Sequence, residues 1–483
     1  MVTRPSTSTL FAAWLLAACS DPAAPSPDAG PPPPPPRPQP PRARITAPST
    51  GRVNTPIRLD GSSSAPSVAD FRWSVVEAPE GAHLLADSDQ PIATLTPRAP
   101  GRFVVELAVR SGSSTASARA RLDVECPEPE VPASVGAGED LVLVDRSPGG
   151  CVDYRSSTDL GVGPGSRAVI EPGVRLEMGP GTVIRVDRGG ELTIGEDPRL
   201  GRVELSGADP RPGSWGGLQV SDGTLRLTSV DLRHAGAGGA AVSTSGAARL
   251  GVRDLAVLQT SGRGLALGER TELFDYGDNR FGAELDAAVE LPLSLLPDLR
   301  AGQDRHDGEA PYRVRGDFLN RPFTLPATGV AWRFAGGPGA GRLVWTADVL
   351  VEPGAVLELD PGVGLELAFG HFVLRGSSDA PVELSGTGAG GWSGLLVSRG
   401  ARAELEQVRF QGAGLSGGGY APAPGPASLT ATSTAGQARA TALSLRAVEI
   451  LDGPGLSIWA EPSVEYSCED VATSGQVAPA CGR

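Results

Sequence analysis

Two pairs of aspartates have the residue types and the spacing that could support chemistry. The pairs are Asp275 and Asp278, within Asp-Tyr-Gly-Asp, and Asp304 and Asp307, within Asp-Arg-His-Asp. Clustered carboxylates can bind Ca²⁺, and two carboxylates can act as acid and base in the hydrolysis of a glycosidic bond. Aspartate is also common in turns because its side chain bonds to the local backbone. We predict that both pairs lie in loops between modules, where the turn role is favoured, and we assign no catalytic residue.

The rest of the composition argues against several other kinds of site. The chain has 483 residues, a net charge of −14 and only four histidines, at 83, 234, 306 and 371, which lie far apart in the sequence. Its five cysteines form no Cys-x-x-Cys pair, so we predict no metal site. A chain this acidic could not neutralise a row of phosphates, which argues against nucleic acid as a partner. We expect no cofactor, and Ca²⁺ on the acidic surface is the alternative left open.

Cys19 follows a short apolar segment near the N-terminus. The tetrapeptide Leu16-Ala-Ala-Cys19 ends this segment, and the run from Leu10 to Leu16 is too short to span a bilayer. This pattern resembles the lipobox of bacterial lipoproteins. The resemblance implies a signal peptide at residues 1–18, cleavage before Cys19, and attachment of lipid to the thiol and the new amine of Cys19. An ordinary secretory signal is the alternative.

The lipobox and the residues after it also predict where the protein resides. The resemblance implies export and a lipid anchor in a membrane of the cell envelope. Ser20 favours the outer membrane, whereas Asp21 leaves the inner membrane open. Residues 19–44 contain the run Pro31–Pro36 and are predicted to be a disordered, lipidated linker with an extended polyproline conformation. Such a linker would hold the folded part away from the membrane.

Four cysteines remain after Cys19, which is an even number in an exported chain. Cys126 and Cys151 flank a predicted domain junction, and Cys468 and Cys481 flank the last segment. Four cysteines allow three disulfide connectivities, and the sequence does not choose among them. Pairing of nearest neighbours would close a loop at each of these two places.

Residues 45–125 are predicted to form a small β-sandwich. Short alternating runs, such as the one from Phe103 to Val109, are separated by turns rich in Pro, Gly and Ser. The Gly-Ser-Ser turn that follows Leu59, the run that ends at Trp73, and the Pro-Gly turn before Phe103 resemble the polycystic-kidney-disease-type (PKD) domain. The Asp-Phe-Gly-Asp-Gly element common in that family is missing after Trp73. Another immunoglobulin-like module is therefore equally acceptable, and we expect Trp73 to be a core residue.

The remainder of the chain contains an internal duplication, with modules at residues 150–305 and 310–483. Such repetition is typical of proteins in which similar units stack on one another. Three pairs of segments match, namely 170–181 with 351–362, 203–207 with 382–386, and the segments beginning at Trp215 and Trp392.

Within each module the apolar residues alternate over three to five residues between glycine-rich and proline-rich corners. This pattern predicts an all-β fold in which a small β-sandwich is followed by a right-handed parallel β-helix made of the two modules. The Gly-x-Trp-x-Gly elements around Trp215 and Trp392, and Gly277-Asp-Asn-Arg-Phe281, resemble an exported bacterial β-helix family. That family is related in fold to the pectin-lyase-like proteins and is common in lipoproteins of predatory soil bacteria. The second module lacks a match to the Asn-x-Phe element, so we expect a disulfide-closed cap around Cys468.

The expected role is a non-catalytic one. We predict a lipid-anchored envelope protein that binds, adheres to or presents a surface to glycans or proteins. One alternative is a polysaccharide-processing enzyme, a lyase or a hydrolase, and the other is a structural scaffold without a specific ligand. Trp215 and Trp392 could stack on sugar rings, but their glycine-flanked positions favour packing at the corners of the β-helix. Converging carboxylates and arginines would favour the enzyme, and exposed aromatic residues would favour glycan binding.

Overall fold

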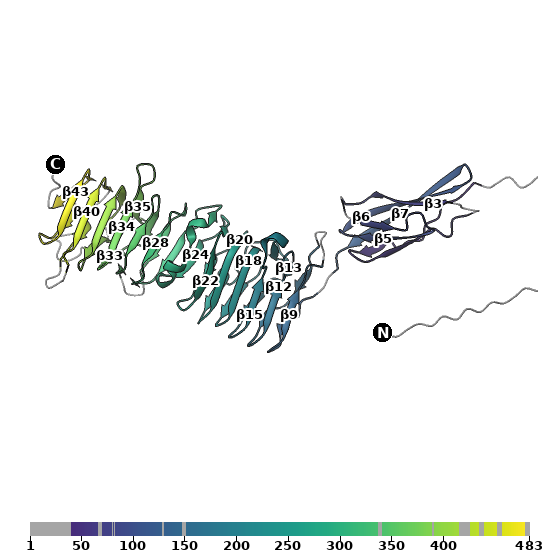
Figure 1. Ribbon diagram of the computed structural model, residues 1–483, viewed down its shortest axis with the longest axis horizontal. Coiled ribbons are helices and arrows are strands. Elements are labelled where there is room, and N and C mark those ends of the chain that lie inside the picture. Colours follow the sequence, from purple (N-terminus) through teal and green to yellow (C-terminus); the bar gives the residue numbers. More distant parts are fainter. Residues whose placement is uncertain are drawn as a thin grey trace, which may run out of the picture.

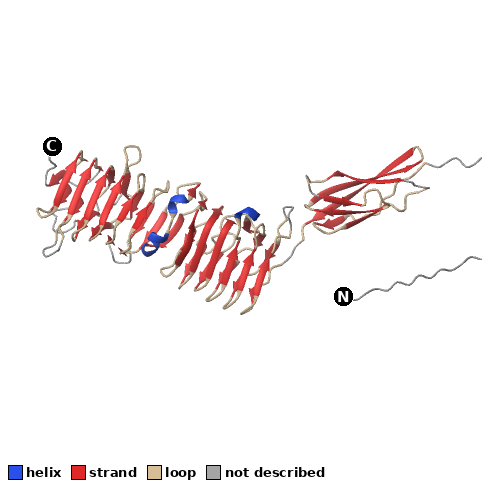
Figure 2. Cartoon of the chain, viewed as in Figure 1, coloured by secondary structure: helices blue, strands red, loops and turns tan. Residues whose placement is uncertain are grey.

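The chain folds into two bodies built almost wholly from β-strands (Figure 1). In the computed structural model the first body contains β1 to β7, and the second contains β8 to β45. Within the described residues, helix is limited to the short 3-10 turns η1 (Pro198–Leu200), η2 (Leu293–Asp298) and η3 (Ala301–Gln303) (Figure 2). The structure describes residues 40–478 except 66–69, 80, 82, 128–129, 147–150, 337–340, 389–390, 415–425, 434–438 and 452–455.

The first body is a β-sandwich of two sheets. One sheet has the strand order β1-β7-β6-β3 and the other has the order β2-β5-β4. Alternate residues of β6, including Phe103 and Leu107, point into the core, where Trp73 is also buried and donates its Nε1 hydrogen to the carbonyl of Gln90 at 3.0 Å. The strands are β1 (Thr50–Arg52), β2 (Ile57–Asp60), β3 (Asp70–Glu77), β4 (His83–Ala86), β5 (Ile92–Pro97), β6 (Gly101–Ser111) and β7 (Ser114–Glu125).

The second body is a parallel β-solenoid, which confirms the predicted fold class. One sheet of 14 strands runs through the whole of it, and successive strands pair in parallel so that inward side chains stack turn on turn. Ile184, Leu218 and Val242 form such a stack and are buried. The strands of this continuous sheet are β8 (Ser134–Val135), β11 (Leu160–Val162), β14 (Val183–Val186), β17 (Gly217–Ser221), β19 (Ala240–Ser245), β21 (Arg263–Ala266), β24 (Ala287–Pro292), β26 (Tyr312–Arg315), β29 (Trp332–Ala335), β32 (Val356–Leu359), β35 (Val382–Gly386), β38 (Val408–Gln411), β41 (Glu449–Leu451) and β44 (Ala472–Thr473).

In the first half of the solenoid, an 11-stranded sheet supplies the other two sides of each turn. The long strands β18 and β20 cross both sides and bend at Ser229 and Asp254, whose φ angles are 55° and 53°. The strands of this sheet are β9 (Asp140–Leu143), β10 (Tyr154–Ser156), β12 (Arg167–Ile170), β13 (Arg175–Met178), β15 (Glu191–Ile194), β16 (Val203–Gly207), β18 (Thr224–Arg233), β20 (Arg249–Leu258), β22 (Glu272–Gly277), β23 (Arg280–Phe281) and β25 (Arg305–His306).

In the second half, two separate sheets take over these sides. The seven-stranded sheet contains β27 (Phe318–Leu319), β30 (Arg342–Trp345), β33 (Gly364–Ala368), β36 (Gly394–Ser398), β39 (Ala427–Ala431), β42 (Leu456–Ala460) and β45 (Gln476–Ala478). The six-stranded sheet contains β28 (Phe323–Leu325), β31 (Val349–Val351), β34 (His371–Arg375), β37 (Arg402–Glu406), β40 (Ala442–Arg446) and β43 (Glu465–Glu469).

The two halves meet where η2 and η3 interrupt the strands. The 11-stranded sheet ends at β25, and the sheets of the second half begin at β27 and β28, so only the 14-stranded sheet crosses this junction. Leu293, Leu295 and Leu296 of η2 are buried in the same core that fills both halves. The two modules therefore form one continuous solenoid, joined by one sheet and by the packing of η2.

The duplicated motif occupies a different sheet in each copy. Val203–Gly207 forms β16 of the 11-stranded sheet, whereas the identical sequence Val382–Gly386 forms β35 of the continuous sheet. Likewise, the strand after Trp215 belongs to the continuous sheet, and the strand after Trp392 belongs to the seven-stranded sheet. The copies are thus separated by a non-integral number of turns and differ by one side of the solenoid.

Candidate functional site

The first aspartate pair is bound by one arginine. Asp275 lies inside β22, and Asp278 follows that strand with a φ of 58°. From the neighbouring strand β20, Arg253 places Nη2 at 2.7 Å from Oδ1 of Asp275 and Nη1 at 3.3 Å from Oδ2 of Asp278. The hydrogen bond from Arg253 lowers the pKa of Asp275 below its ordinary value. The prediction that this pair lies in a loop is wrong for Asp275, because β22 extends the sheet and carries its side chain.

The second aspartate pair is divided between the surface and the interior. Asp307 is exposed and lies 3.0 Å from the guanidinium of Arg280 in β23. Asp304 instead turns inward, where its Oδ2 accepts the hydroxyls of Tyr276 at 2.5 Å and Tyr312 at 2.7 Å. Burial raises the pKa of Asp304 to about 6. The structure therefore does not bring these two carboxylates together as a catalytic pair.

The interior around Asp304 contains residues that the sequence did not single out. The backbone NH of Asn279 donates to Oδ1 of Asp304 at 2.9 Å, and Nε2 of His306 lies 3.3 Å from the hydroxyl of Tyr312. Burial lowers the pKa of His306 to about 4, and its ring stacks on Phe281 with 5.6 Å between ring centres. Two buried atoms, Nδ1 of His306 and Nδ2 of Asn279, have no hydrogen-bond partner. The chain has only five tyrosines, which is the one sequence signal that could have drawn attention to this cluster.

The four predicted carboxylates do not form a cation site. Among the residues that the structure describes, no group of three or more His, Cys, Asp or Glu side chains could hold a metal ion. The chemistry available at Asp275, Asp278 and Asp307 is ion pairing with arginine. Asp304 is a half-buried hydrogen-bond acceptor between two strands.

The two repeated tryptophans are core residues. Trp215 and Trp392 are fully buried. The Nε1 atom of Trp215 donates to the carbonyl of Arg233 at 2.7 Å, and that of Trp392 donates to the carbonyl of Gln411 at 3.1 Å. Each indole therefore fills space inside a corner and bonds to the backbone of a later strand. The structure supports packing for both residues, since neither ring can reach a ligand at the surface.

Arginine and carboxylate side chains pair across the turns of the solenoid. In a parallel sheet, residues in register lie directly above one another, so opposite charges on neighbouring strands meet. Arg202 contacts Asp231 at 2.6 Å and Asp254 at 2.7 Å. Glu366, which is buried, lies 2.8 Å from Arg342. These charged groups stabilise the outer surface and are engaged with each other.

The outer side of the six-stranded sheet carries two hollows, and we call this side the β28–β43 face. The first hollow, of about 480 Å³, is lined by Thr324, Leu350 and Val373 together with Asp348 and His371. Leu350 is 42% exposed, although its neighbours in β31 are buried. The second hollow, of about 320 Å³, lies toward the C-terminus of the same sheet and is lined by Arg402, Ser444, Glu465, Tyr466 and Ser467 among others.

A charged group separates the two hollows. Glu404 in β37 places Oε1 at 3.2 Å from Nε2 of His371 and at 3.1 Å from Nε of Arg402. Burial raises the pKa of Glu404, but the hydrogen bonds from His371 and Arg402 outweigh this effect and leave it below its ordinary value. The β28–β43 face thus has an apolar end, a paired charged centre and a hydroxyl-rich end.

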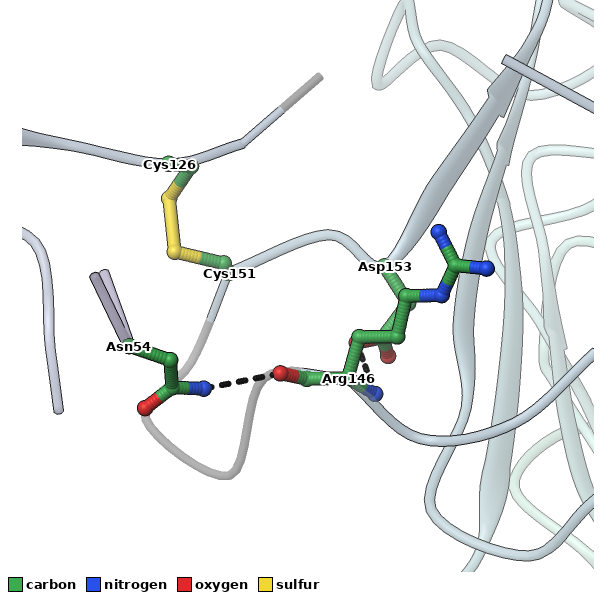
Figure 3. Close-up of a disulfide and its surroundings, with 5 residues drawn as sticks. All are labelled: Asn54, Cys126, Arg146, Cys151 and Asp153. Carbon is green, nitrogen blue, oxygen red and sulfur yellow. Dashed lines mark hydrogen bonds between the residues drawn. A yellow bond between two sulfur atoms is a disulfide. The ribbon is translucent and has the colours of Figure 1, made fainter. Parts of the chain in front are cut away.

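A disulfide connects the sandwich to the solenoid (Figure 3). It joins Cys126, directly after β7, to Cys151, which is buried and packs with the core of the sandwich. Nearby, Nδ2 of Asn54 donates to the carbonyl of Arg146 at 2.8 Å, and Asp153 accepts the backbone NH of Arg146 at 2.9 Å. The pairing is the one between nearest neighbours.

Several other residues named in the predictions lie outside the described part of the chain. Cys468 is disulfide-bonded, and Cys481 lies outside the described residues. Cys19, the predicted signal peptide and the linker as far as residue 39 lie outside them as well. Within the described residues, every helix is too short or too polar to cross a bilayer.

Comparisons with known proteins include a weak likeness to a solved structure. No protein-family model matches the chain, and neither does any curated protein. Among solved structures, the chain is similar to the solution structure of the PKD domain from KIAA 1837 protein, with 20% sequence identity and a TM-score of 0.16. The likeness covers 17% of this chain and 85% of that domain.

Proposed function

We propose that this chain is a lipid-anchored protein of the bacterial cell envelope that presents a non-catalytic binding surface to glycans or proteins outside the cell. The observation that carries this proposal is the engagement of the candidate carboxylates. Arg253 binds Asp275 and Asp278, Arg280 binds Asp307, and Asp304 is enclosed by two tyrosines. Carboxylates and an arginine do converge at Asp275, but they are bound to one another in ion pairs. A lyase or hydrolase would need carboxylates that are free to bind a cation or transfer protons at an open cleft.

The architecture is consistent with presentation of a surface. A solenoid with a single continuous sheet offers a long, regular outer surface on which side chains repeat from turn to turn. The disulfide between Cys126 and Cys151 ties this body to the sandwich, which precedes it in the chain. Together with the predicted linker, these features would place a rigid binding surface away from the membrane.

The lipid anchor rests on the resemblance of Leu16-Ala-Ala-Cys19 to a lipobox. Buried acyl chains stabilise membrane attachment by about 0.8 kcal/mol per methylene, so two or more chains would hold the protein firmly. We place the protein in the outer membrane because Ser20 follows the cysteine. Expression of the full chain and of Cys19→Ser in a bacterial host tests this. We expect the wild type in the membrane fraction with the mass of an acylated chain, and the variant without that mass; equal masses and fractionation would refute the anchor.

One assay distinguishes binding from catalysis. The full chain carrying Cys19→Ser is incubated with a panel of polysaccharides, with and without Ca²⁺, while bound ligand and released products are both measured. We expect saturable binding to a member of the panel and no new reducing ends or unsaturated products. Depolymerisation would overturn the non-catalytic role and favour the polysaccharide-processing alternative. An absence of both would leave a protein ligand or a scaffold role to be tested.

A further inference from the structure

The β28–β43 face differs from the corresponding face of the first module. The segment Ile170-Glu-Pro-Gly aligns with Val351-Glu-Pro-Gly, so Leu350 in β31 corresponds to Val169 in β12. Both residues point outward between buried neighbours. In the first module, Arg226 lies two turns beyond Val169, and the guanidinium groups of Arg226 and Arg249 lie 4.9 Å and 5.4 Å from the ring centre of Phe274. A smaller hollow, of about 240 Å³, lies beside Phe274. The β28–β43 face has the two hollows described above.

The charges on the β28–β43 face disfavour an anionic ligand. Its outward positions and the residues flanking its strands carry seven carboxylates and three guanidinium groups, which leaves an excess of negative charge. Arg402 and Arg375 both contact Glu404, so they are not free to bind a phosphate or a uronate. The carboxylates are Asp348, Glu352, Glu404, Glu406, Glu465, Glu469 and Asp470, and the guanidinium groups are those of Arg375, Arg402 and Arg446.

The remaining surface groups suit a ligand with both apolar and hydroxyl faces. Leu350 and Val373 line the apolar hollow, and Ser444 and Ser467 line the polar one, where their hydroxyls lie 3.2 Å apart. Phe369, at the corner before β34, is 54% exposed and has a φ of 66°, which is unusual for a bulky residue. Neighbouring strands lie about 4.8 Å apart, so the five steps from β28 to β43 span about 24 Å. This length suits a chain of repeating units that crosses the strands.

We infer that the β28–β43 face binds an uncharged polysaccharide chain, with sugar-ring faces in the hollow at Leu350 and sugar hydroxyls in the hollow at Ser444. This inference rests on the proposed function and specifies its ligand class and site. Negative charge on the face repels acidic polymers, whereas a neutral chain is not repelled. Ring faces pack on Leu350 and Val373. The serine hydroxyls donate or accept hydrogen bonds at the sugar edges, and the carboxylates accept hydrogen bonds from sugar hydroxyls.

Four proteins test the inference, each as the full chain with Cys19→Ser. They are this background, Leu350→Arg, Ser444→Arg, and Val169→Arg as the matched control on the first module. Binding is measured to a soluble neutral β-glucan, to chitohexaose and to polygalacturonate, the last with and without Ca²⁺. Thermal unfolding confirms that each variant is folded, which is expected because Leu350 and Ser444 are exposed.

The expected result is binding of at least one neutral ligand, weakened at least tenfold by Leu350→Arg and by Ser444→Arg and unchanged by Val169→Arg. Neutral binding that survives both substitutions would overturn the assigned site while leaving the proposed binding function standing. Preference for polygalacturonate would overturn the ligand class in the same way. A lack of binding to all three polymers would overturn this inference, and the proposed function would then depend on a protein ligand.

Discussion

The hydroxyl of Tyr312 donates to Oδ2 of Asp304 at 2.7 Å, and this bond links the two halves of the solenoid. Tyr312 begins β26, the strand that leads into the second half, whereas Asp304 precedes β25, the last strand of the 11-stranded sheet. Tyr276 of β22 donates to the same oxygen at 2.5 Å. A single carboxylate therefore joins strands on both sides of the place where two sheets end and begin.

Asp304→Asn should change how stability depends on pH. Burial raises the pKa of Asp304 from 3.8 to about 6, so the folded state holds this proton more tightly than the unfolded state. The resulting stabilisation is complete below pH 3.8 and is lost as the pH rises through about 6. The free energy of unfolding of the wild type should fall relative to Asp304→Asn between pH 4 and pH 7, by at most about 3 kcal/mol. Urea unfolding of both proteins at each pH measures this, and a constant difference would contradict it.

The stability difference between the wild type and His306→Asn should depend on pH in the opposite direction. Burial lowers the pKa of His306 from 6.5 to about 4, with the charge of Asp307 opposing this, so the folded state favours the neutral ring. That stabilisation is present above pH 6.5 and is lost as the pH falls toward 4. The wild type should therefore lose stability relative to His306→Asn on acidification. The double variant with Asp304→Asn serves as the control, and its profile should be flatter than that of either single variant.

Removal of the disulfide should destabilise the region where the two bodies meet. The bond closes a separation of 25 residues and involves the buried Cys151. In the chain-entropy account, a loop of this size stabilises the folded state by about 3 kcal/mol. Calorimetry of Cys126→Ala/Cys151→Ala should give a lower unfolding temperature for the sandwich. Asn54→Gly removes the exposed hydrogen bond to Arg146 and tolerates the φ of 59° at this position, so it should cost less than about 1 kcal/mol. An equal effect of the two changes would argue against the disulfide as the main link.

Gly217→Ala should lower the free energy of unfolding for two reasons, namely backbone strain and a collision of the new methyl group with the adjacent turn. Gly217 has a φ of 84°, and a Cβ atom there would lie 2.3 Å from the carbonyl oxygen of Ala241 in the adjacent turn. We expect a loss of about 3 kcal/mol from strain and collision together. Gly181 has a φ of 73° with open space around it, so Gly181→Ala should lose only about 1 kcal/mol. Chemical denaturation of both variants checks this, and similar losses would mean that the contact with Ala241 is relieved at little cost.

The sequence by itself determined the class of the fold. Alternating residues such as Leu176 and Met178, separated by Pro-Gly corners, can bury one side only if short strands stack, and the duplication indicated that the stack repeats. It also favoured core positions for Trp73, Trp215 and Trp392, since each large ring is flanked by small or alternating residues that leave room for it. These conclusions follow from local patterns, because the side chains that alternate along one strand decide which face of that strand is buried.

Only the tertiary structure decided which residues share a site. Asp304 is separated from its partner Tyr276 by 28 residues, and Asp307 is separated from its partner Arg280 by 27. Nothing in the local sequence indicates that Asp304 turns inward and Asp307 outward. The side of the solenoid on which each copy of the repeat lies also depends on how many turns separate the copies. That number is set by where corners bend and where η2 replaces a strand. In a solenoid, each residue contacts residues about one turn earlier and later in the chain. An insertion or deletion at one corner therefore changes the neighbours of every later strand.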